Sequence, residues 1–297
     1  MKHLSTAFVV LAALFWGLSG GIGGILIENG WNAFVVSFYR GGIGLLFVLV
    51  WLLFRPRGSG LSNHRLWFWS AIAGLGVAGN FAFYFMSISE GGVAVAASLM
   101  YTAPVFVYLA SFTLKLEKST PLKWAAVVLV IIGIVLLTQV YDIKASSVTP
   151  MGVLAGLLAG VSYAVFIFGF KFAAPHGSPQ AILSIAFTVL AAVLIWPSDG
   201  NQIVAVLSTQ DWMLFAILGV LGAGLSFIIY IIGLKNTAPA VASVVAMAEP
   251  VTASLFGVFI LNENLAGLQI LGVGLILVTV TTLSVQSGPQ LVDSKSE

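Results

Sequence analysis

The chain carries one pattern twice, at positions 146 residues apart. Five residues recur at this offset: Phe81, Tyr84, Ala96, Pro104 and Glu117 return as Phe227, Tyr230, Ala242, Pro250 and Glu263. A looser match, at an offset of 147, relates residues 13–16 to residues 160–163. Self-similarity of this kind indicates structural repeats. We therefore divide the chain into a first repeat at 1–144, a second at 145–285 and a disordered, cytoplasmic tail at 286–297.

The composition excludes a water-soluble fold. Soluble domains have about 25% charged residues, whereas this chain has 7% charged and 60% hydrophobic residues. The formal net charge is +2 and no basic run is long, which argues against nucleic-acid binding. With no cysteine and three scattered histidines, the sequence predicts neither a metal site nor a cofactor.

Charged and turn residues divide the chain into ten apolar segments, each near the roughly 20 residues that a membrane-spanning helix needs. The expected spans are 5–27, 33–54, 66–88, 92–114, 122–140, 150–170, 179–197, 212–234, 239–261 and 265–284. The first span follows Lys2 and His3 as a signal peptide would, but nine more spans follow, so we expect an uncleaved helix. The predicted fold class is an all-α membrane protein of ten transmembrane helices.

Basic residues set the expected orientation in the cytoplasmic (inner) membrane. With both termini in the cytoplasm, ten basic residues fall on the inner side and Lys144 alone on the outer side, a strong positive-inside bias. The ten are Lys2, Arg55, Arg57, Arg65, Lys115, Lys118, Lys123, Lys171, Lys235 and Lys295. Five helices per repeat is an odd number, so the second repeat must insert upside down relative to the first. The sequence thus predicts two inverted five-helix repeats.

Short motifs recur in the same order in both halves. The first half has Ala103-Pro104-Val105 and then Leu114-Lys115-Leu116-Glu117, and the second has Ala248-Glu249-Pro250-Val251 and then Leu261-Asn262-Glu263. With Trp16-Gly17 in the first span and Arg40 in the second, the chain resembles the drug/metabolite transporter superfamily, EamA type, over about residues 5–284. Its richness in Trp, Tyr and Phe is most similar to the aromatic amino acid exporters of the YddG type.

This resemblance implies a central cavity surrounded by spans one to four and six to nine, with spans five and ten at the periphery. It implies export of small metabolites by alternating access, with amino acids, including aromatic ones, as the expected solutes. The expected partners are this solute and the lipid bilayer, and one chain would hold a complete pathway as a monomer.

Other functions stay open at this point. Drugs or nucleosides are alternative solutes within the same superfamily. A passive channel would also suit a polar interior, although no ring of charges or filter sequence is present. An intramembrane enzyme needs a nucleophile–base or metal set, and the expected spans offer no His pair, no Cys and no paired carboxylates. We therefore expect a transporter with no catalytic residues.

Glu249 is the most costly side chain in the expected spans. It lies ten residues into a span of 23, and a charge at the bilayer centre costs roughly 2.5–3.5 kcal/mol on insertion scales. It must therefore face protein or water. Three roles are open: an ion pair with Arg40 that serves structure or gating, proton coupling, and contact with the amino group of a substrate.

Pro104 and Pro250 occupy matching places in the middle of their spans. Because proline cannot donate to the carbonyl four residues back, each should bend its helix. The bend is either fixed, so that it shapes the cavity, or a hinge for alternating access. A carbonyl freed by either proline could also bind substrate.

Polar and aromatic side chains within the spans are the candidates for substrate binding. Helical periodicity places several of them on shared faces, where they either line a pocket or bond to neighbouring helices. The candidates are Trp16, Asn80, Tyr84, Ser98, Tyr101, Ser162, Tyr163, Tyr230 and Ser243.

Overall fold

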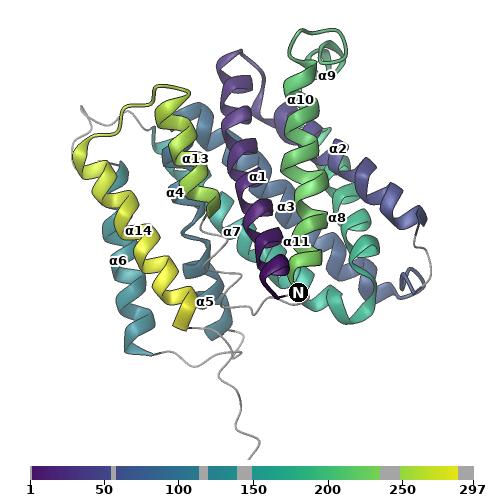
Figure 1. Cartoon of the computed structure of the whole chain (residues 1–297), viewed down its shortest axis with the longest axis horizontal. Helices are drawn as coiled ribbons and strands as arrows, with labels where there is room; N and C mark the ends of the chain where they lie inside the picture. Colours follow the sequence, from purple (N-terminus) through teal and green to yellow (C-terminus); the bar gives the residue numbers. More distant parts are fainter. Residues whose placement is uncertain (1, 55–57, 114–119, 139–148, 235–247, 287–297) are drawn as a thin grey trace, which may run out of the picture.

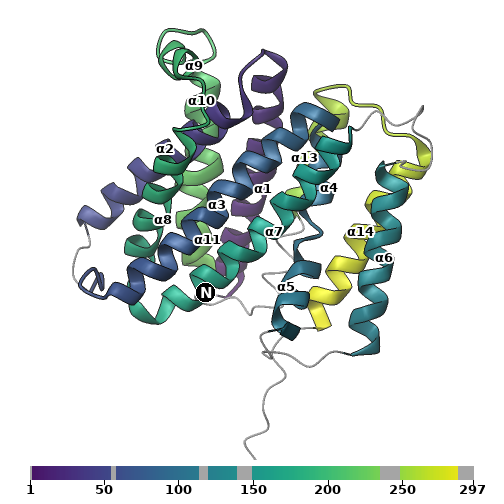
Figure 2. The ribbon, with the colours of Figure 1, turned by 180° about the vertical axis from the view of Figure 1, so that it is seen from behind.

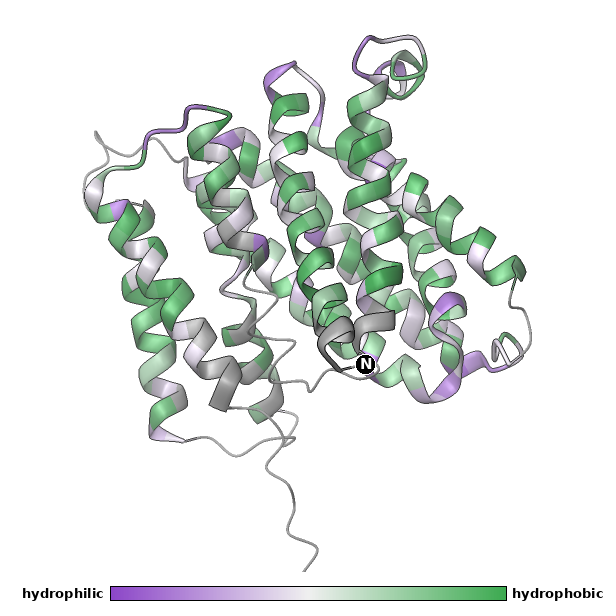
Figure 3. Ribbon diagram, viewed as in Figure 1, coloured by the Kyte–Doolittle hydropathy of each residue, from purple (hydrophilic) through white to green (hydrophobic). Residues whose placement is uncertain are grey.

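The computed structural model describes residues 2–54, 58–113, 120–138, 149–234 and 248–286. These parts of the chain fold as helices and connecting turns, without β-strands (Figure 1). Hydrophobic residues cover the helices, and hydrophilic ones gather at the connections between them (Figure 3). This distribution is the one expected of helices that cross an apolar layer.

The first half of the chain begins with three long helices and continues with three shorter ones. They are α1 (Lys2–Glu28), α2 (Ala33–Phe54), α3 (His64–Gly91), α4 (Val93–Met100), α5 (Ala103–Thr113) and α6 (Pro121–Thr138). The segment expected as one span at 92–114 is thus divided between α4 and α5. Pro104 lies in the first turn of α5, where its missing N–H breaks no helical hydrogen bond. The proline therefore starts a new helix instead of bending an existing one.

The second half contains two helical turns that depart from α geometry, the 3₁₀ turn η1 and the π-helical turn η2. Its elements are α7 (Pro150–Ala173), η1 (Ala174–His176), α8 (Pro179–Leu194), α9 (Gly200–Ala205), α10 (Trp212–Gly219), η2 (Val220–Leu225), α11 (Ser226–Leu234), α13 (Ala248–Phe259) and α14 (Gly267–Gln286). The element η2 is a π-helix that joins α10 to α11 without interruption. The short helix α9 was not expected from the sequence. It lies in the connection before α10, and the Asp199 carboxylate caps its first turn.

Within the described residues, five helices are long and apolar enough to cross a membrane. They are Ala7–Glu28, Ala33–Phe54, His64–Gly91, Pro150–His176 and Trp212–Tyr230. The other expected spans correspond to shorter apolar helices or continue into residues outside the described ones. Ten spans therefore remain a prediction.

The helix contacts are related in pairs: a contact between two helices has a counterpart between the equivalent helices of the opposite halves. Helix α3 packs along α7, and α1 packs along α11; α4 packs on α7, and α13 packs on α1. Two contacts are their own counterparts, because α2 packs on α8 and α6 packs on α14. The α6–α14 pair lies at one side of the bundle (Figures 1 and 2). This pairing is the one that two structurally related halves produce.

The helix connections gather at two ends of the bundle. At one end the Trp31 indole donates to the Asp211 carboxylate at 2.7 Å. At the other end the Ser178 amide donates to the Ser59 carbonyl at 3.0 Å. Figure 1 places the α13–α14 connection at the Trp31 end, and the end of α5 at the opposite one. An inverted repeat predicts that the equivalent helices α5 and α13 end at opposite sides of the bundle.

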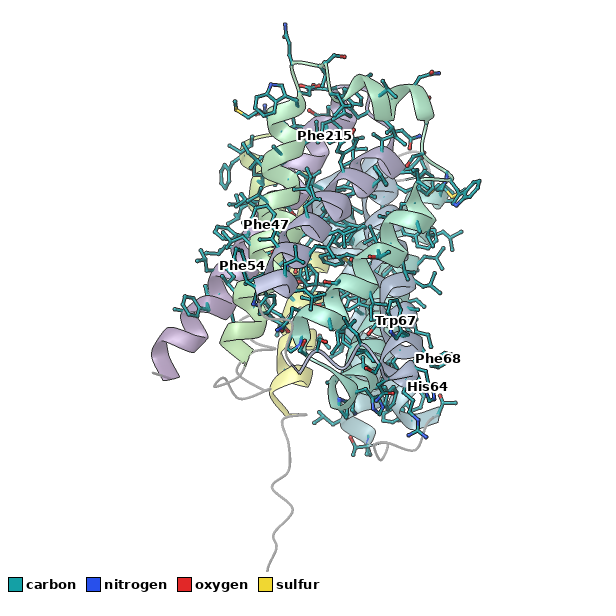
Figure 4. The ribbon with its side chains drawn as sticks, turned by 90° about the vertical axis from the view of Figure 1, so that its right-hand side faces the viewer. Phe47, Phe54, His64, Trp67, Phe68 and Phe215 are labelled. Atoms are coloured by element: carbon teal, nitrogen blue, oxygen red, sulfur yellow. The ribbon has the colours of Figure 1, made fainter. Side chains whose placement is uncertain are left out.

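Large apolar side chains cover parts of the outer surface. Figure 4 shows Phe47 and Phe54 on the outer side of α2, and Trp67 and Phe68 near the start of α3. Phe54 is 82% exposed and Phe68 is 60% exposed. In a soluble protein such side chains would mark an interaction site, whereas in a membrane protein they contact lipid.

Glycine allows α3 and α7 to approach closely. A Cβ atom at Gly76 would lie 2.5 Å from the amide nitrogen of Phe166, which is backbone and cannot move aside cheaply. We expect Gly76→Ala to lower the melting temperature, because overpacking typically costs about 1–3 kcal/mol. Gly42→Ala is the matched control, since nothing lies within 4 Å of that position. Equal melting temperatures of the two purified variants would contradict this account of the α3–α7 contact.

Candidate functional site

A cavity of about 820 Å³ lies within the bundle and is lined from both halves. Its walls are mostly apolar and aromatic, with a few polar groups. The lining residues are Trp16, Arg40, Asn80, Phe81, Tyr163, Phe166, Ile167, Phe170, Lys171, Ala174, Gly177, Pro179, Ile182, Leu183, Phe227, Tyr230 and Glu249. This volume and character are those of a pocket that encloses a small organic molecule.

One face of α7 supplies much of the cavity wall. Tyr163, Phe166, Ile167, Phe170 and Lys171 follow the i, i+3, i+4, i+7, i+8 spacing of a helical stripe. The aromatic rings contact one another along this stripe, with centroids 4.4 Å apart for the first two. Lys171 is exposed, so the stripe runs from a buried aromatic region to a charged rim.

The rim of the cavity lies at the α7–α8 connection. Gly177 and Pro179 line it there, and the neighbouring Ser178 amide bonds to Ser59 in the connection before α3. The orientation expected from the basic residues assigns both connections to the cytoplasmic side. The cavity thus reaches the end of the bundle at which Lys171 stands.

Glu249 lies in the cavity wall and is only 8% exposed. The Tyr101 hydroxyl donates a hydrogen bond to its carboxylate. Tyr101 is 4% exposed and is not among the lining residues. It therefore binds the carboxylate of Glu249 from the side that faces away from the cavity. A buried carboxylate needs such donors, because leaving it unpaired in an apolar region costs several kcal/mol.

Arg40 is 4% exposed and also lines the cavity. Its Nε and Nη2 atoms donate to the Gly222 carbonyl at 3.3 and 3.2 Å. Its guanidinium lies 4.0 Å from the centre of the Phe81 ring, a cation–π contact. Each charge is thus held by a different hydrogen-bond partner, and an ion pair between Arg40 and Glu249 stays one of the roles that the sequence leaves open.

An aromatic cluster forms another part of the wall. The Trp16 ring lies 5.2 Å from that of Phe227 and 4.9 Å from that of Tyr230. The Trp16 indole N–H is buried and has no hydrogen-bond partner among the described residues. Asn80, in contrast, donates its amide to the Ala159 carbonyl at 3.0 Å, which leaves its own oxygen as an acceptor.

Six predicted site residues come together at this cavity, and others lie elsewhere. Those that line it are Trp16, Arg40, Asn80, Tyr163, Tyr230 and Glu249. The Ser98 hydroxyl is fully buried and bonds to Ala94 within its own helix. Tyr84 packs against Gly20, and the Ser162 hydroxyl packs against Gly79. Ser243 lies outside the described residues.

The backbone places both prolines near the described starts of their helices. Both fall in the first turn of a described helix, Pro104 in α5 and Pro250 in α13. The carbonyl of Met100, which the break before Pro104 frees, lies against α7: a Cβ at Gly160 would be 3.1 Å from it. In this arrangement the freed carbonyl faces a neighbouring helix and not the solute space.

Glu263 closes the opposite end of the bundle. Its carboxylate accepts hydrogen bonds from the Val93 amide and, at 3.0 Å, from the Ala94 amide, which are the first residues of α4. Gly92 and Gly257 leave room for this carboxylate, since a Cβ at either would collide with it. A negative charge on a helix N-terminus is stabilising. The cap joins the α13–α14 connection to the α3–α4 junction.

Some lining residues were not predicted, although signals for them exist in the sequence. Phe81 and Phe227 are repeat partners, so their recurrence alone could have marked them. Phe166 and Phe170 lie on the same helical face as Tyr163, which was predicted. The bond between Arg40 and Gly222 has no sequence signal, because no motif or repeat relates these two positions.

Apolar helices around a cavity that contains buried charges define a multi-pass membrane transporter. The EamA-like transporter family model matches residues 4–139 and again residues 150–285. The chain belongs to the EamA-like transporter family. In the described residues, no group of three or more His, Cys, Asp or Glu side chains could hold a metal ion.

Named relatives are also transporters. The uncharacterized transporter YwfM of Bacillus subtilis is 26% identical over 95% of this chain and 94% of its own. The threonine/homoserine exporter RhtA of Salmonella typhimurium is 26% identical over 73% of this chain and 72% of its own. A protein of known crystal structure shares the fold with a TM-score of 0.62 at 19% identity, over 96% of this chain and 99% of that one.

Proposed function

We propose that this transporter exports small metabolites, chiefly amino acids including aromatic ones, through the 820 Å³ cavity. The observation that supports this most directly is the combination in one wall of a carboxylate, a guanidinium and aromatic rings. Glu249 suits the ammonium group of an amino acid, and Arg40 suits its carboxylate. The aromatic stripe of α7 suits an apolar side chain.

The threonine/homoserine exporter among the relatives supports amino acids as the solute class. The narrower likeness to aromatic amino acid exporters is supported by the rings that line the cavity, from Trp16 to Phe170. Both inferences concern the solute, whereas transport itself follows from the family.

The proposed mechanism is alternating access between two inverted five-helix repeats, 1–144 and 145–285. The cavity reaches the end of the bundle that carries Lys171, and the Glu263 cap closes the other end. With both termini in the cytoplasm of the inner membrane, this arrangement would be the state that loads solute from inside. One chain supplies the whole cavity, so a monomer suffices.

Counterflow in proteoliposomes tests the proposal. Vesicles that contain the purified protein are preloaded with an excess of one unlabelled solute, and uptake of the same solute in labelled form is followed, in turn for amino acids, nucleosides and cationic drugs. Saturable exchange of amino acids supports the proposal. Exchange of nucleosides or drugs without amino acids would favour the alternative, an exporter of those solutes. Non-saturable flux would indicate a channel.

Tyr163→Ala is expected to weaken transport of aromatic solutes more than that of small ones. Removing the ring deletes a stacking surface worth roughly 0.5–1.5 kcal/mol, up to about a tenfold change in apparent affinity. The measurement is competition by phenylalanine and by threonine against a labelled solute. Tyr39→Phe is the control, because Tyr39 bonds to Ile203 away from the cavity. Equal losses for both solutes would mean that Tyr163 serves packing alone.

A further inference from the structure

The π-helical turn η2 interrupts the helix whose last part lines the cavity. In an α-helix each amide bonds to the carbonyl four residues back, whereas in a π-helix it bonds to the one five back. One extra residue is thereby held within the turn. Phe227 and Tyr230, both in the cavity wall, follow this turn directly. The register of η2 therefore decides which face of α11 meets the cavity.

Gly222, in the middle of η2, is the point at which α2 holds this turn. Its carbonyl accepts both hydrogen bonds from Arg40. It has no room for a side chain, since a Cβ there would lie 2.8 Å from Arg40 Nε and 2.8 Å from Ser19 Cβ. Arg40, which is 4% exposed, thus donates two of its N–H groups to one backbone carbonyl. An α-helix and a π-helix both pair each carbonyl with one backbone amide, so Arg40 takes the remaining lone pair, the one that a helical serine can use.

Ser226 indicates which hydrogen bond would form if η2 were a regular α-helix. Its hydroxyl is fully buried and has no hydrogen-bond partner among the described residues. Two other buried helical serines donate to the carbonyl four residues back, Ser37 to Ala33 at 2.7 Å and Ser98 to Ala94 at 2.9 Å, whereas Ser70 and Ser184 also have no partner among the described residues. For Ser226 that carbonyl is Gly222, which Arg40 occupies instead. Arg40 and Ser226 thus compete for one acceptor.

We propose that Arg40 is a positioning residue that locks η2 in its π register and so keeps Phe227 and Tyr230 in the cavity wall. If Arg40 leaves Gly222, the turn relaxes to an α-helix and Ser226 takes the carbonyl. Everything after the turn then rotates by about 100°, the angle of one residue. Ser226 and Ile229 move to the places of Phe227 and Tyr230.

If the bond between Arg40 and Gly222 fixes the register of η2, a solute that binds Arg40 would change the cavity wall. This effect of the solute rests on the proposed function, because the carboxylate of an amino acid in the cavity would be a stronger partner for Arg40 than a neutral carbonyl. A bound solute would draw Arg40 away from Gly222 and release the turn. The register lock itself needs no solute and is testable in the empty protein.

Single cysteines report the register, since the natural chain contains none. Tyr230→Cys and Ile229→Cys are each labelled with a small maleimide in detergent, in the Arg40 and R40Q backgrounds. With Arg40 present, we expect position 230 to react several-fold faster than position 229. In R40Q the order should reverse. An unchanged order in a folded R40Q protein overturns the proposal, whatever its transport activity.

Deletion of Leu221 in R40Q provides a rescue. Removing one residue from the turn allows a regular helix while returning position 230 to the cavity, so labelling of 230 should again exceed that of 229. A folded double variant that keeps the reversed order also overturns the lock. Ser37→Ala on α2 is the matched control, because it removes a bond inside α2 only, and it should leave the order unchanged.

If R40Q does not fold, as judged by size-exclusion chromatography, R40K carries the test. Lysine keeps the charge but cannot make the two-donor fork, so we expect labelling at 229 to rise at least about twofold relative to 230. An unchanged ratio in R40K would then exclude the lock. These labelling ratios need no substrate, so their failure is distinguishable from a failure to transport amino acids.

Discussion

Glu249→Gln is expected to lower transport by roughly tenfold or more and to remove any dependence of the rate on pH. The amide keeps the shape and can still accept from Tyr101, but it carries no charge and releases no proton. A hydrogen bond to a charged group contributes about 1.5–3 kcal/mol, which corresponds to a factor of ten or more in rate. The measurement is counterflow of a labelled amino acid over a series of pH values, with the protein amount normalised.

Two variants separate the possible roles of this carboxylate. Tyr101→Phe removes its hydrogen-bond donor without changing the cavity lining, so a positioning effect should appear there too, but more weakly. Ser98→Ala is the control, since Ser98 is buried in the neighbouring α4 and bonds only within that helix. Wild-type rates across the pH series in Glu249→Gln would exclude both coupling and solute contact.

Glu263→Gln is expected to open the end of the bundle opposite the cavity rim. The carboxylate holds two amides at the start of α4, and the neutral amide loses the charge that makes this cap strong. A loss of about 1.5 kcal/mol would raise the open population roughly tenfold. The reporter is Ile88→Cys, because Ile88 is 6% exposed and lines a separate pocket of about 230 Å³ at this end. Its rate of maleimide labelling should rise accordingly.

Glu28→Gln is the matched control for the cap. Glu28 lines the same small pocket but is exposed, so its change should leave the labelling of Ile88→Cys as in the parent protein. Melting temperatures of both variants distinguish opening from unfolding: a cap variant that labels faster while staying folded supports a closed end held by Glu263. Equal labelling in both variants would show that hydrophobic packing alone closes it.

Much of this architecture could be predicted from the residues because membrane helices obey few rules. Apolar length gave the helix positions within a few residues, as for α2 at Ala33–Phe54 and α7 from Pro150. The repeat offset identified Tyr230 and Trp16 as members of related positions, and both line the cavity. The break between α4 and α5 was missed because a proline predicts a disturbance, but not whether the helix bends or restarts.

The partners of buried charges were harder to predict. Arg40 and Glu249 are opposite charges, with Arg40 expected at a somewhat shallower depth, so an ion pair was one of the open roles; each of them binds an uncharged group. The partner of Arg40 lies in the π-helical turn η2, and no residue pattern specifies that turn. The partner of Glu249 lies 148 residues away, at Tyr101 directly after the end of α4, a proximity that only the fold creates.

The side-by-side packing of α6 and α14 has a consequence for how such a chain can be assembled. A Cβ at Gly272 would lie 2.7 Å from the Gly133 carbonyl, and Gln269 donates to Leu137 across the same seam. Helix α2 also packs on its equivalent α8. The α2–α8 and α6–α14 contacts therefore both bury one half of the chain against the other. Each half alone would leave these contact surfaces uncovered. A gene cut within residues 139–149 should therefore yield two polypeptides that accumulate only when they are co-expressed.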